Sequence, residues 1–310
     1  MVSKNGSISL VGQDILITGG AGFIGSAVAN ALVPDNEVRV FDNLSNGRKS
    51  NVPDEATLIK GDIRNETDLK QAIDGVDIIF HQAGQISVEK SVDRPKETHD
   101  INVTATLNVL ECAREENAKL IFASSAAVYG QPEEIPISEN ASTDPTSPYG
   151  LSKLAAEKYV RLYAELYDLS TVAFRYFNVY GPGQVSGDYN AVISVFVEQA
   201  TSGEPITVEG DGTQTRDFVH VQDIVRANLL AAQSDVTGVF NVGTGRSVSV
   251  LDLAKTVRDV IDSESEITHV AERSGDIEHS HADISRIKTT LGFEPSISLE
   301  EGLKTLVEQE

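Results

Sequence analysis

Short runs of apolar residues alternate with longer amphipathic stretches from Asp14 to about Arg175. The apolar runs predict buried strands at 15–18, 38–41, 57–60, 76–81, 120–124 and 171–174. The amphipathic stretches predict helices at 24–32, 66–73, 98–116 and 148–167, each long enough to return the chain across one face of a sheet. Strands that alternate with helices in this way favour an α/β fold built on a doubly wound parallel sheet.

The pattern becomes less regular after Asn178. A Gly- and Pro-rich loop at 181–189 precedes an expected helix at about 191–202, and short strands and helices follow. Ligands of open α/β sheets bind at the carboxyl ends of the strands. We therefore expect a Rossmann-type domain in residues 1–177 and a smaller C-terminal α/β substrate-binding lobe in residues 178–310. Some segments of the second half are expected to return to the first domain.

Composition narrows the possible partners. The chain has 47 acidic and 25 basic residues, a net charge of −22, and 40 % of its residues are hydrophobic. The charges are interspersed with apolar residues, which favours a folded protein over a disordered acidic one. Nucleic acids and anionic lipid surfaces are bound mainly through Lys and Arg. We therefore expect no nucleic-acid partner and no membrane contact.

The cysteine count and the apolar runs bear on location. Cys112 is the single cysteine, so neither an intrachain disulfide nor a cysteine-rich zinc site can form, and we expect no metal. No apolar run reaches 18 residues, and the first 13 residues lack the apolar core of a secretory leader. We expect a cytoplasmic protein.

Three glycines follow the first predicted strand in the spacing GxxGxxG: Gly19, Gly22 and Gly25. Glycine permits positive φ, lets the backbone approach a pyrophosphate, and allows the next helix to pack closely on the strand. The N-terminus of that helix would face the anion. A tight turn without a ligand is the alternative interpretation of the glycines alone.

Acidic residues after the next two strands refine this interpretation. Asp42 ends the second strand, where a carboxylate accepts both hydroxyls of an adenosine ribose and repels a 2′-phosphate, so NAD is favoured over NADP. Arg48 and Lys49 lie nearby, either as partners of a 2′-phosphate or as an exposed basic turn. Asp62 follows the third strand and either bonds an adenine amino group or caps the next helix.

Tyr149 and Lys153 are four residues apart in a predicted helix and therefore share one face. A phenol titrates near pH 10, and an adjacent cation favours the phenolate that acid/base catalysis requires at neutral pH. A hydroxyl from Ser125 or Ser124, at the end of the fifth strand, would share the proton relay.

With these motifs in order, the chain resembles the extended short-chain dehydrogenase/reductase family, and within it nucleotide-sugar 4-epimerases of the UDP-glucose 4-epimerase type. The resemblance covers almost the whole chain. The motifs that carry it are TGGAGFIG at 18–25, DNL at 42–44, GDIR at 61–64, HQAGQ at 81–85, SSAAVYG at 124–130, SPYGLSK at 147–153, RYFNVYG at 175–181, GDGTQTRDF at 210–218, NVGTG at 241–245 and RSGD at 273–276.

The resemblance implies NAD as cofactor, with Tyr149 as the acid/base. Lys153 would hold ribose hydroxyls and depress the pKa of Tyr149, the stretch from His81 to Gln85 would line the nicotinamide side, and Asn102 would lie beneath it. The residues implied to bind the cofactor are Gly19, Gly22, Phe23, Ile24, Gly25, Asp42, Asn43, Asp62, Ile63, Gln82, Ala83, Gly84, Gln85, Asn102, Tyr149, Lys153 and Phe177.

The resemblance also implies a UDP-sugar substrate whose diphosphate is held by Asn178, Arg216 and Arg273. A small Ser280 would leave room for an N-acetyl group at C2, although Glu209 stands where an aromatic residue often lies near uracil. The residues implied to contact substrate are Ser125, Asn178, Ala191, Val192, Thr207, Val208, Glu209, Arg216, Arg273, Asp276 and Ser280.

The residues after the active-site hydroxyl bear on the reaction. Related 4,6-dehydratases carry an Asp-Glu pair and related decarboxylases a Glu just before Val-Tyr-Gly, whereas this chain has Ala126 and Ala127. Elimination then lacks its proton donor, which leaves oxidation and reduction at C4 through a 4-keto sugar. The alternatives are a UDP-glucuronate 4-epimerase, a 4-keto nucleotide-sugar reductase and, more remotely, a non-enzymatic NAD-sensing protein.

Two further expectations concern the whole molecule. Related enzymes are commonly homodimers through helices that correspond here to about 98–116 and 149–167. The excess of carboxylates would repel itself at low ionic strength and be screened by salt, so we expect a halophilic cytoplasm.

Overall fold

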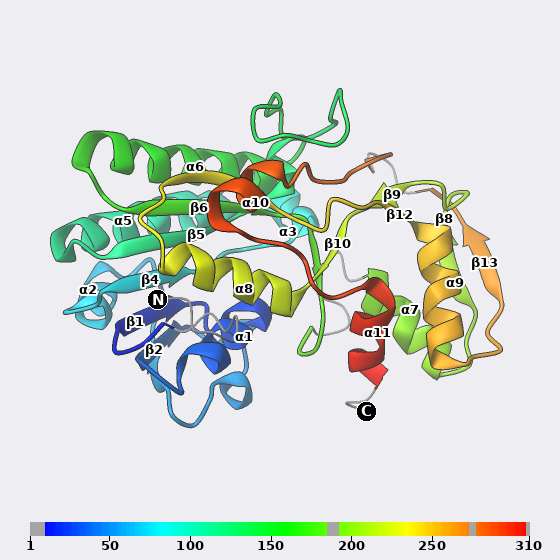
Figure 1. Ribbon diagram of the computed structural model, residues 1–310, viewed down its shortest axis with the longest axis horizontal. Helices are drawn as coiled ribbons and strands as arrows, with labels where there is room; N and C mark the ends of the chain where they lie inside the picture. Colours follow the sequence, from blue (N-terminus) through cyan, green and yellow to red (C-terminus); the bar gives the residue numbers. More distant parts are fainter. Residues whose placement is uncertain (1–9, 185–191, 273–276, 308–310) are drawn as a thin grey trace.

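The computed structural model describes residues 10–184, 192–272 and 277–307. A parallel seven-stranded sheet lies at its centre, in the order β11-β6-β5-β4-β1-β2-β3 (Figure 1). The doubly wound sheet predicted from the apolar runs is confirmed, and the carboxyl ends of its strands share one edge. Its strands are β1 (Asp14–Thr18), β2 (Glu37–Asp42), β3 (Thr57–Lys60), β4 (Ile78–His81), β5 (Lys119–Ser125), β6 (Thr171–Tyr176) and β11 (Gly238–Val242).

Helices cover both faces of this sheet and bury their apolar stripes against it. One face carries α1 (Phe23–Leu32), α8 (Val221–Ala232) and α10 (Ser285–Leu291). The other face carries α2 (Glu66–Ile73), α5 (Ala105–Glu116) and α6 (Pro148–Tyr167). The sheet is buried on both sides, which explains why its strands read as continuous apolar runs.

The helix expected at 98–116 is not one regular helix. It comprises the end of α4 (Pro95–His99), a π-helical turn η2 (Asp100–Thr104) and α5. The wide turn carries Asn102, whose buried amide bonds the backbone of Gln85. Such turns occur mostly as local bulges and often at functional sites. The prediction of an uninterrupted helix is wrong here, because an apolar period averaged over several turns does not reveal one widened turn.

A smaller lobe lies beside the carboxyl edge of the sheet (Figure 1, right). Three two-stranded sheets pair β7 with β10, β9 with β12 and β8 with β13. Its helices α7, α9 and α11 pack on β8 and β10 in one apolar cluster. The bounds are β7 (Asn178–Tyr180), α7 (Val192–Thr201), β8 (Ile206–Glu209), β9 (Thr215–Arg216), β10 (Phe218–His220), β12 (Val248–Ser249), α9 (Val250–Ile261), β13 (Ile267–Val270) and α11 (Leu299–Val307).

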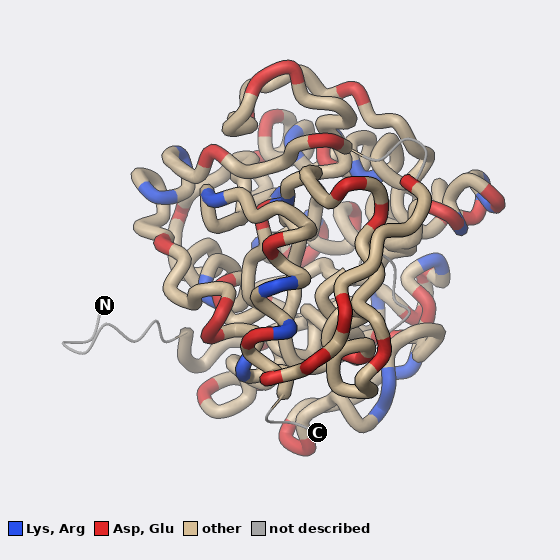
Figure 2. Tube along the Cα trace, turned by 90° about the vertical axis from the view of Figure 1, so that its right-hand side faces the viewer, with Lys and Arg blue, Asp and Glu red and all other residues tan. Residues whose placement is uncertain are grey.

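The second half of the chain contributes to both lobes. Helix α8 and strand β11 lie beyond residue 177, yet they complete one face and one edge of the large sheet. Acidic residues are spread along the trace and outnumber basic ones (Figure 2). Among the described residues, no helix combines the length and the apolar character that crossing a bilayer requires.

Candidate active site

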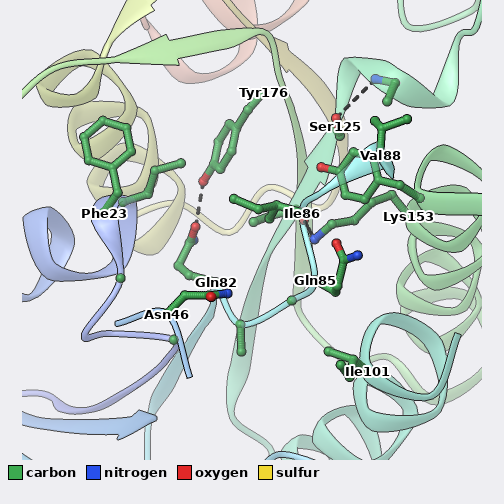
Figure 3. A pocket seen from close by; sticks show the side chains of 18 of the residues that line it. Phe23, Asn46, Gln82, Gln85, Ile86, Val88, Ile101, Ser125, Lys153 and Tyr176 are labelled. Atoms are coloured by element: carbon green, nitrogen blue, oxygen red, sulfur yellow. Dashed lines mark hydrogen bonds between the residues drawn. The ribbon is translucent and has the colours of Figure 1, made fainter. Parts of the chain in front are cut away.

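A cavity of about 1070 Å³ lies at the carboxyl ends of the parallel strands. Its walls include the turn after β1, the segments after β2, β3, β4 and β5, and the start of α6. The smaller lobe contributes Asn178, Arg216, Ile277 and Ser280. This is the edge at which open α/β sheets bind ligands. Figure 3 shows side chains of the larger lobe, among them Phe23, Gln82 and Lys153, around this space.

The glycine turn after β1 leaves no room for side chains. Gly19 has φ +71°, and a Cβ there would lie 2.6 Å from the backbone nitrogen of Ala83. A Cβ on Gly25 would lie 2.3 Å from the carbonyl oxygen of Gly19. Gly22 is the N-cap of α1, and within the described chain no side chain caps that end, so the first N–H groups remain for an anion. Both features fit a dinucleotide pyrophosphate.

Asp42 is positioned as the predicted ribose acceptor. Its carboxylate is 7 % exposed and accepts hydrogen bonds from the backbone N–H of Ala21 at 3.0 Å and of Leu44 at 2.8 Å. These bonds hold a negative charge at the cavity wall, which disfavours a 2′-phosphate. Arg48 and Lys49 are not part of that wall, so the residues fit NAD rather than NADP.

Asp62 also lines the cavity, but it is not a helix cap. Asn65 caps α2, and its side chain accepts from the N–H groups of Thr67 and Asp68, so the capping alternative for Asp62 is wrong. Asp62 instead accepts from Arg64 at 2.7 and 2.9 Å and from Asn43 at 3.1 Å. The Arg64 guanidinium holds the pKa of Asp62 well below its usual range. An ionised acceptor is therefore present at the adenine end.

Helix α6 begins at the cavity and carries the predicted catalytic pair. Ser147 caps it by accepting from the N–H of Gly150 at 3.1 Å. Tyr149 and Lys153 are both buried and both line the cavity. The Lys153 ammonium donates to the carbonyl oxygen of Ala123 at 2.8 Å. Burial lowers the pKa of Lys153 to about 8.

Burial raises the pKa of Tyr149, and a hydrogen bond with Ser125 opposes that rise. Lys153 is not among the causes of the shift. In the protein alone the loss of solvation dominates this pKa, and the effect of Lys153 on it stays a prediction.

Of the two candidate hydroxyls, the structure favours Ser125. Ser124 is 3 % exposed, and its Oγ donates to Glu157 Oε2 at 2.7 Å, so that hydroxyl is already committed. Ser125 Oγ accepts from the N–H of Ala127 at 3.2 Å, lines the cavity and lowers the pKa of Tyr149. Both serines line the cavity, and the bond from Ser124 to Glu157 favours Ser125 as the catalytic hydroxyl.

The segment after β4 forms the floor of the cavity. Gln82, Ala83, Gly84 and Gln85 line it as expected. His81 does not, because its ring is buried between the hydroxyls of Thr18 at 2.6 Å and Thr106 at 3.0 Å. This part of the expectation is wrong.

Asn102 lies behind the segment after β4 and holds its backbone in place. Its Oδ1 accepts from the N–H of Gln85 at 2.8 Å, and its Nδ2 donates to the carbonyl oxygen of Gln85 at 2.9 Å. It is 2 % exposed and is not part of the cavity wall. Asn102 therefore positions Gln85 and is not a direct cofactor contact.

The remaining predicted cofactor residues line the cavity: Gly22, Phe23, Ile24, Asn43, Ile63 and Phe177. Sequence reasoning missed several wall residues, among them Ile86, Val88 and Tyr176 (Figure 3). Ile86 and Val88 follow the HQAGQ motif, and Tyr176 lies between Arg175 and Phe177 of another motif. Their position within or directly after these motifs was the signal that could have identified them as cavity residues.

The substrate residues divide into three groups. Ser125, Asn178, Arg216 and Ser280 line the cavity. Ala191, Arg273 and Asp276 lie outside the described residues. Four others, all from α7 and β8, are not in the cavity wall: Val192, Thr207, Val208 and Glu209.

The side chains of β8 explain part of this result. Val208 is fully buried in the apolar cluster of the smaller lobe. Thr207 pairs with Gln199, whose amide donates to Thr207 Oγ1 at 2.9 Å and accepts from its N–H at 3.0 Å. The expectation that these two side chains contact the base is therefore wrong.

Comparison with known proteins agrees with this geometry. The profile of the NAD dependent epimerase/dehydratase family matches residues 15–243. A UDP-glucose 4-epimerase of Mycolicibacterium smegmatis is 36 % identical over 304 residues, which cover 94 % of this chain and 97 % of that protein.

Two solved structures are similar along their whole length. A UDP-N-acetylglucosamine 4-epimerase from Methanobrevibacter ruminantium M1, in complex with UDP-N-acetylmuramic acid, has a TM-score of 0.93 and 38 % identity over 97 % of this chain and 100 % of that one. A UDP-glucose 4-epimerase from Thermotoga maritima, with UDP-glucose, has a TM-score of 0.91 and 38 % identity over 95 % and 97 %. The chain therefore belongs to the NAD dependent epimerase/dehydratase family, as an NAD-dependent extended short-chain dehydrogenase/reductase of the nucleotide-sugar epimerase type.

Proposed function

We propose that the protein interconverts the C4 epimers of a UDP-hexose through a 4-keto sugar. The substrates would be UDP-glucose and UDP-galactose, and also UDP-GlcNAc and UDP-GalNAc. The observation that carries the proposal is the cavity wall itself, in which Tyr149 and Ser125 lie with Ala126 and Ala127. One acid/base is present there, and methyl groups occupy the positions at which an elimination would need a second.

Each protein group has a defined part in this reaction. Tyr149 takes the proton of the C4 hydroxyl, with its phenolate form favoured by the Lys153 ammonium, and Ser125 orients that hydroxyl. NAD, when bound, supplies reversible two-electron oxidation at C4. Asn178 and Arg216 hold the diphosphate, so the keto sugar can turn about its link and present its other face. Tyr149 then returns the proton to the C4 oxygen.

Turnover without added cofactor tests the proposal. We expect purified protein to convert UDP-Glc and UDP-GlcNAc into their C4 epimers, and Tyr149→Phe to lower kcat by ~10²- to 10⁴-fold. Tyr159→Phe is the matched control, because Tyr159 lies on the same helix but is 38 % exposed. Full activity of Tyr149→Phe would overturn the assignment.

The same assay separates the alternatives. Turnover of UDP-glucuronate alone would identify a UDP-glucuronate 4-epimerase. NADH consumption with a 4-keto sugar, and no epimerisation, would identify a reductase. Bound NAD without turnover of any of these substrates would favour an NAD-sensing protein.

Ser280 supports the wider substrate range. It lines the cavity, and its small side chain leaves space for an acetamido group. We expect Ser280→Tyr to lose activity on UDP-GlcNAc while most activity on UDP-Glc remains. Equal effects on the two substrates would contradict this role, as would a wild-type protein inactive on UDP-GlcNAc.

An exposed apolar stripe on α6 supports a homodimer. Leu151, Tyr159, Leu162 and Leu166 are 58 %, 38 %, 42 % and 67 % exposed, and their spacing places them on one face of the helix. A second copy of the chain would cover this stripe. We expect light scattering to show a dimer for the wild type and a monomer for Leu162→Glu/Leu166→Glu. Val270→Glu, an exposed site on β13, should remain dimeric.

A further inference from the structure

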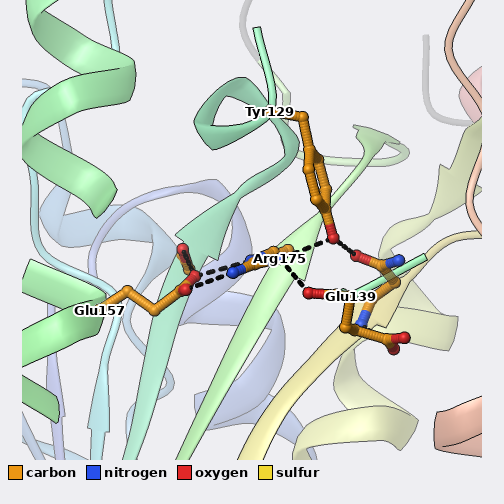
Figure 4. A network of polar contacts seen from close by, with 6 residues as sticks. Tyr129, Glu139, Glu157 and Arg175 are labelled. Carbon is orange, nitrogen blue, oxygen red and sulfur yellow. Dashed lines mark hydrogen bonds and ion pairs between the residues drawn. The ribbon is translucent and has the colours of Figure 1, made fainter. Parts of the chain in front are cut away.

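A buried ion pair joins the catalytic helix to the sheet. Glu157 on α6 and Arg175 on β6 form two hydrogen bonds, Nε to Oε2 at 2.9 Å and Nη2 to Oε1 at 2.6 Å (Figure 4). Their side chains are 1 % and 6 % exposed. Neither residue is part of the cavity wall. The pair is therefore not a direct contact for either ligand.

The pair lies on the same helix face as the catalytic residues. Tyr149, Lys153 and Glu157 follow one another at intervals of four residues, so each occupies a successive turn. Lys153 and Glu157 bond the end of β5, Lys153 through the carbonyl oxygen of Ala123 and Glu157 through the hydroxyl of Ser124. Tyr149 and Ser125 line the same cavity. These polar contacts therefore fix the position of α6 along the axis of β5, that is, the register between the helix and the strand.

Arg175 extends the same network to the opposite wall. Its Nη1 donates to the Tyr129 hydroxyl at 2.8 Å and to the carbonyl oxygen of Glu139 at 3.1 Å. Tyr129 in turn donates to Asn241 Oδ1 at 2.6 Å, and Asn241 Nδ2 donates to the carbonyl oxygen of Ile137 at 2.8 Å. Ile137 lines the cavity. One guanidinium therefore connects α6, the segment after Ser125 and the wall that carries Ile137.

Stability alone does not account for such a pair. Replacing a buried ion pair by apolar residues of similar volume is often neutral or stabilising, whereas removing one partner is strongly destabilising. The best-attested advantage of a buried polar pair is that it specifies one register between packed elements. Here the register decides whether the Tyr149 phenol meets the Ser125 hydroxyl.

We propose that Glu157 and Arg175 are positioning residues for proton transfer: they lock α6 and β5 in the register that places the Tyr149 phenol beside the Ser125 hydroxyl in the cavity wall. The proposal rests on Tyr149 as the acid/base of the proposed function. Proton transfer needs its partners at hydrogen-bond distance, and small displacements lower the rate steeply. Loss of the lock would therefore lower kcat much more than it raises KM.

The test replaces both charges at once. We expect Glu157→Leu/Arg175→Met to melt within about 5 °C of the wild type, while Glu157→Gln and Arg175→Met alone melt lower. The double variant should still lose about tenfold or more in kcat, with KM within about twofold. The pKa of Tyr149 should also rise, because the Ser125 bond that lowers it is lost. Tyrosinate absorbance, compared with Tyr149→Phe, reports this pKa in a chain without tryptophan.

Two further variants keep the test decisive. The control is Asp223→Asn, which removes a buried carboxylate outside this network; Asp223 accepts hydrogen bonds from Ser296. This variant should have a lower melting temperature, with kcat and the Tyr149 pKa unchanged. If the double variant does not fold, Ser124→Ala breaks the link from Glu157 to β5 and leaves the ion pair intact. It should lower kcat and raise the Tyr149 pKa.

Wild-type kcat and an unchanged Tyr149 pKa in the double variant, or in Ser124→Ala where only that variant folds, would overturn the positioning role. An active Tyr149→Phe would instead overturn the proposed function. The two failures are therefore distinguishable.

Discussion

Gly25 is required by a close backbone approach. A Cβ at this position would lie 2.3 Å from the Gly19 carbonyl oxygen, which belongs to the phosphate-binding turn and cannot swing away as a side chain would. We expect Gly25→Ala to push α1 off the turn and weaken NAD binding about tenfold or more, because its N–H groups no longer converge on the pyrophosphate. NAD content and titration with NAD measure this effect.

A glycine far from the turn provides the control for Gly25→Ala. Gly75 has φ +70°, and a Cβ there would meet nothing within 4 Å. Gly75→Ala strains the backbone and should lower stability, but it should leave NAD affinity unchanged. Equal NAD affinity in the two variants would contradict the steric explanation.

His81 makes folding sensitive to acid. Burial of the ring lowers its pKa from 6.5 to about 3, with a smaller contribution from Lys153. Between these two values the unfolded chain binds a proton that the folded chain does not. The free energy of unfolding should therefore fall as the pH falls through this window, by about 1.4 kcal/mol per pH unit for this group. Above pH 6.5 the group contributes no pH dependence.

Denaturant unfolding at several pH values tests this dependence. His81→Gln removes the titrating ring, so its unfolding free energy should change less steeply with pH than that of the wild type. His99→Gln, at an exposed position, should keep the wild-type slope. A His81→Gln slope equal to the wild-type slope would contradict the prediction.

Residue types and spacing predicted most of the positions that line the cavity, but not the orientation of each side chain. Ser124 and Ser125 are neighbours, and sequence reasoning did not distinguish them. The structure does, because alternate residues of β5 face opposite ways and Ser124 turns toward Glu157. The sequence also does not show that the side chains of His81 and Val208 point away from the cavity. Both are buried in the core.

At the scale of elements, Asp217 joins three segments near the substrate side. Its buried carboxylate accepts from Thr244 N at 2.7 Å, Thr244 Oγ1 at 2.6 Å, Gly245 N at 3.0 Å and Ala282 N at 3.1 Å. It directly follows β9, which ends at Arg216, and Ala282 lies two residues beyond Ser280. One carboxylate thus fixes the segments that carry Arg216 and Ser280.

Asp217→Asn tests this junction. An amide offers one acceptor oxygen and turns an NH₂ group toward backbone donors, so bonds to the carboxylate are lost. We expect KM for the UDP-sugar to rise about tenfold with little change in kcat or NAD affinity. Asp223→Asn, a buried carboxylate on α8, should lower stability without this change in KM. A matching rise in the KM of the control would show that Asp217 acts only through global stability.

The elements themselves were largely predictable, because a parallel sheet buried on both faces requires continuous apolar runs. What the runs do not encode is pairing between distant segments. Strand β11 joins β6 through partners such as Phe240 and Phe174, and neither sequence indicates the other. The π-helical turn at Asn102 was missed because it is a local departure from an otherwise regular helix.

At the scale of the whole molecule, the two lobes need each other to form the site. The larger lobe provides the glycine turn, Asp42, Ser125 and Tyr149, whereas the smaller lobe provides Arg216 and Ser280. The C-terminal half also supplies the edge strand β11 to the sheet. A cut at residue 177 would therefore expose the edge of β6 and remove one wall of the cavity. The site is a property of the complete chain.

The surface charge should make stability depend on salt. The net charge is −22, and acidic residues are distributed over the whole trace (Figure 2). Ion pairs such as Arg94–Glu97 and Arg161–Glu165 are exposed and contribute little. The remaining carboxylates repel one another, and salt shortens that repulsion from about 10 Å at 0.1 M to about 3 Å at 1 M. We expect the melting temperature to rise, and activity to persist, as KCl increases to molar concentration.

An uncharged solute separates screening from other effects of concentrated solutions. Sucrose stabilises proteins by exclusion from their surface and does not screen charge. If screening dominates, KCl should raise the melting temperature between about 0.1 M and 1 M, as the Debye length shortens from about 10 Å to about 3 Å. A variant with Glu133→Gln and Glu134→Gln in an exposed loop should show a smaller rise. Loss of activity in molar KCl would contradict the halophilic expectation, because an enzyme adapted to screened carboxylates should retain both its fold and its turnover there.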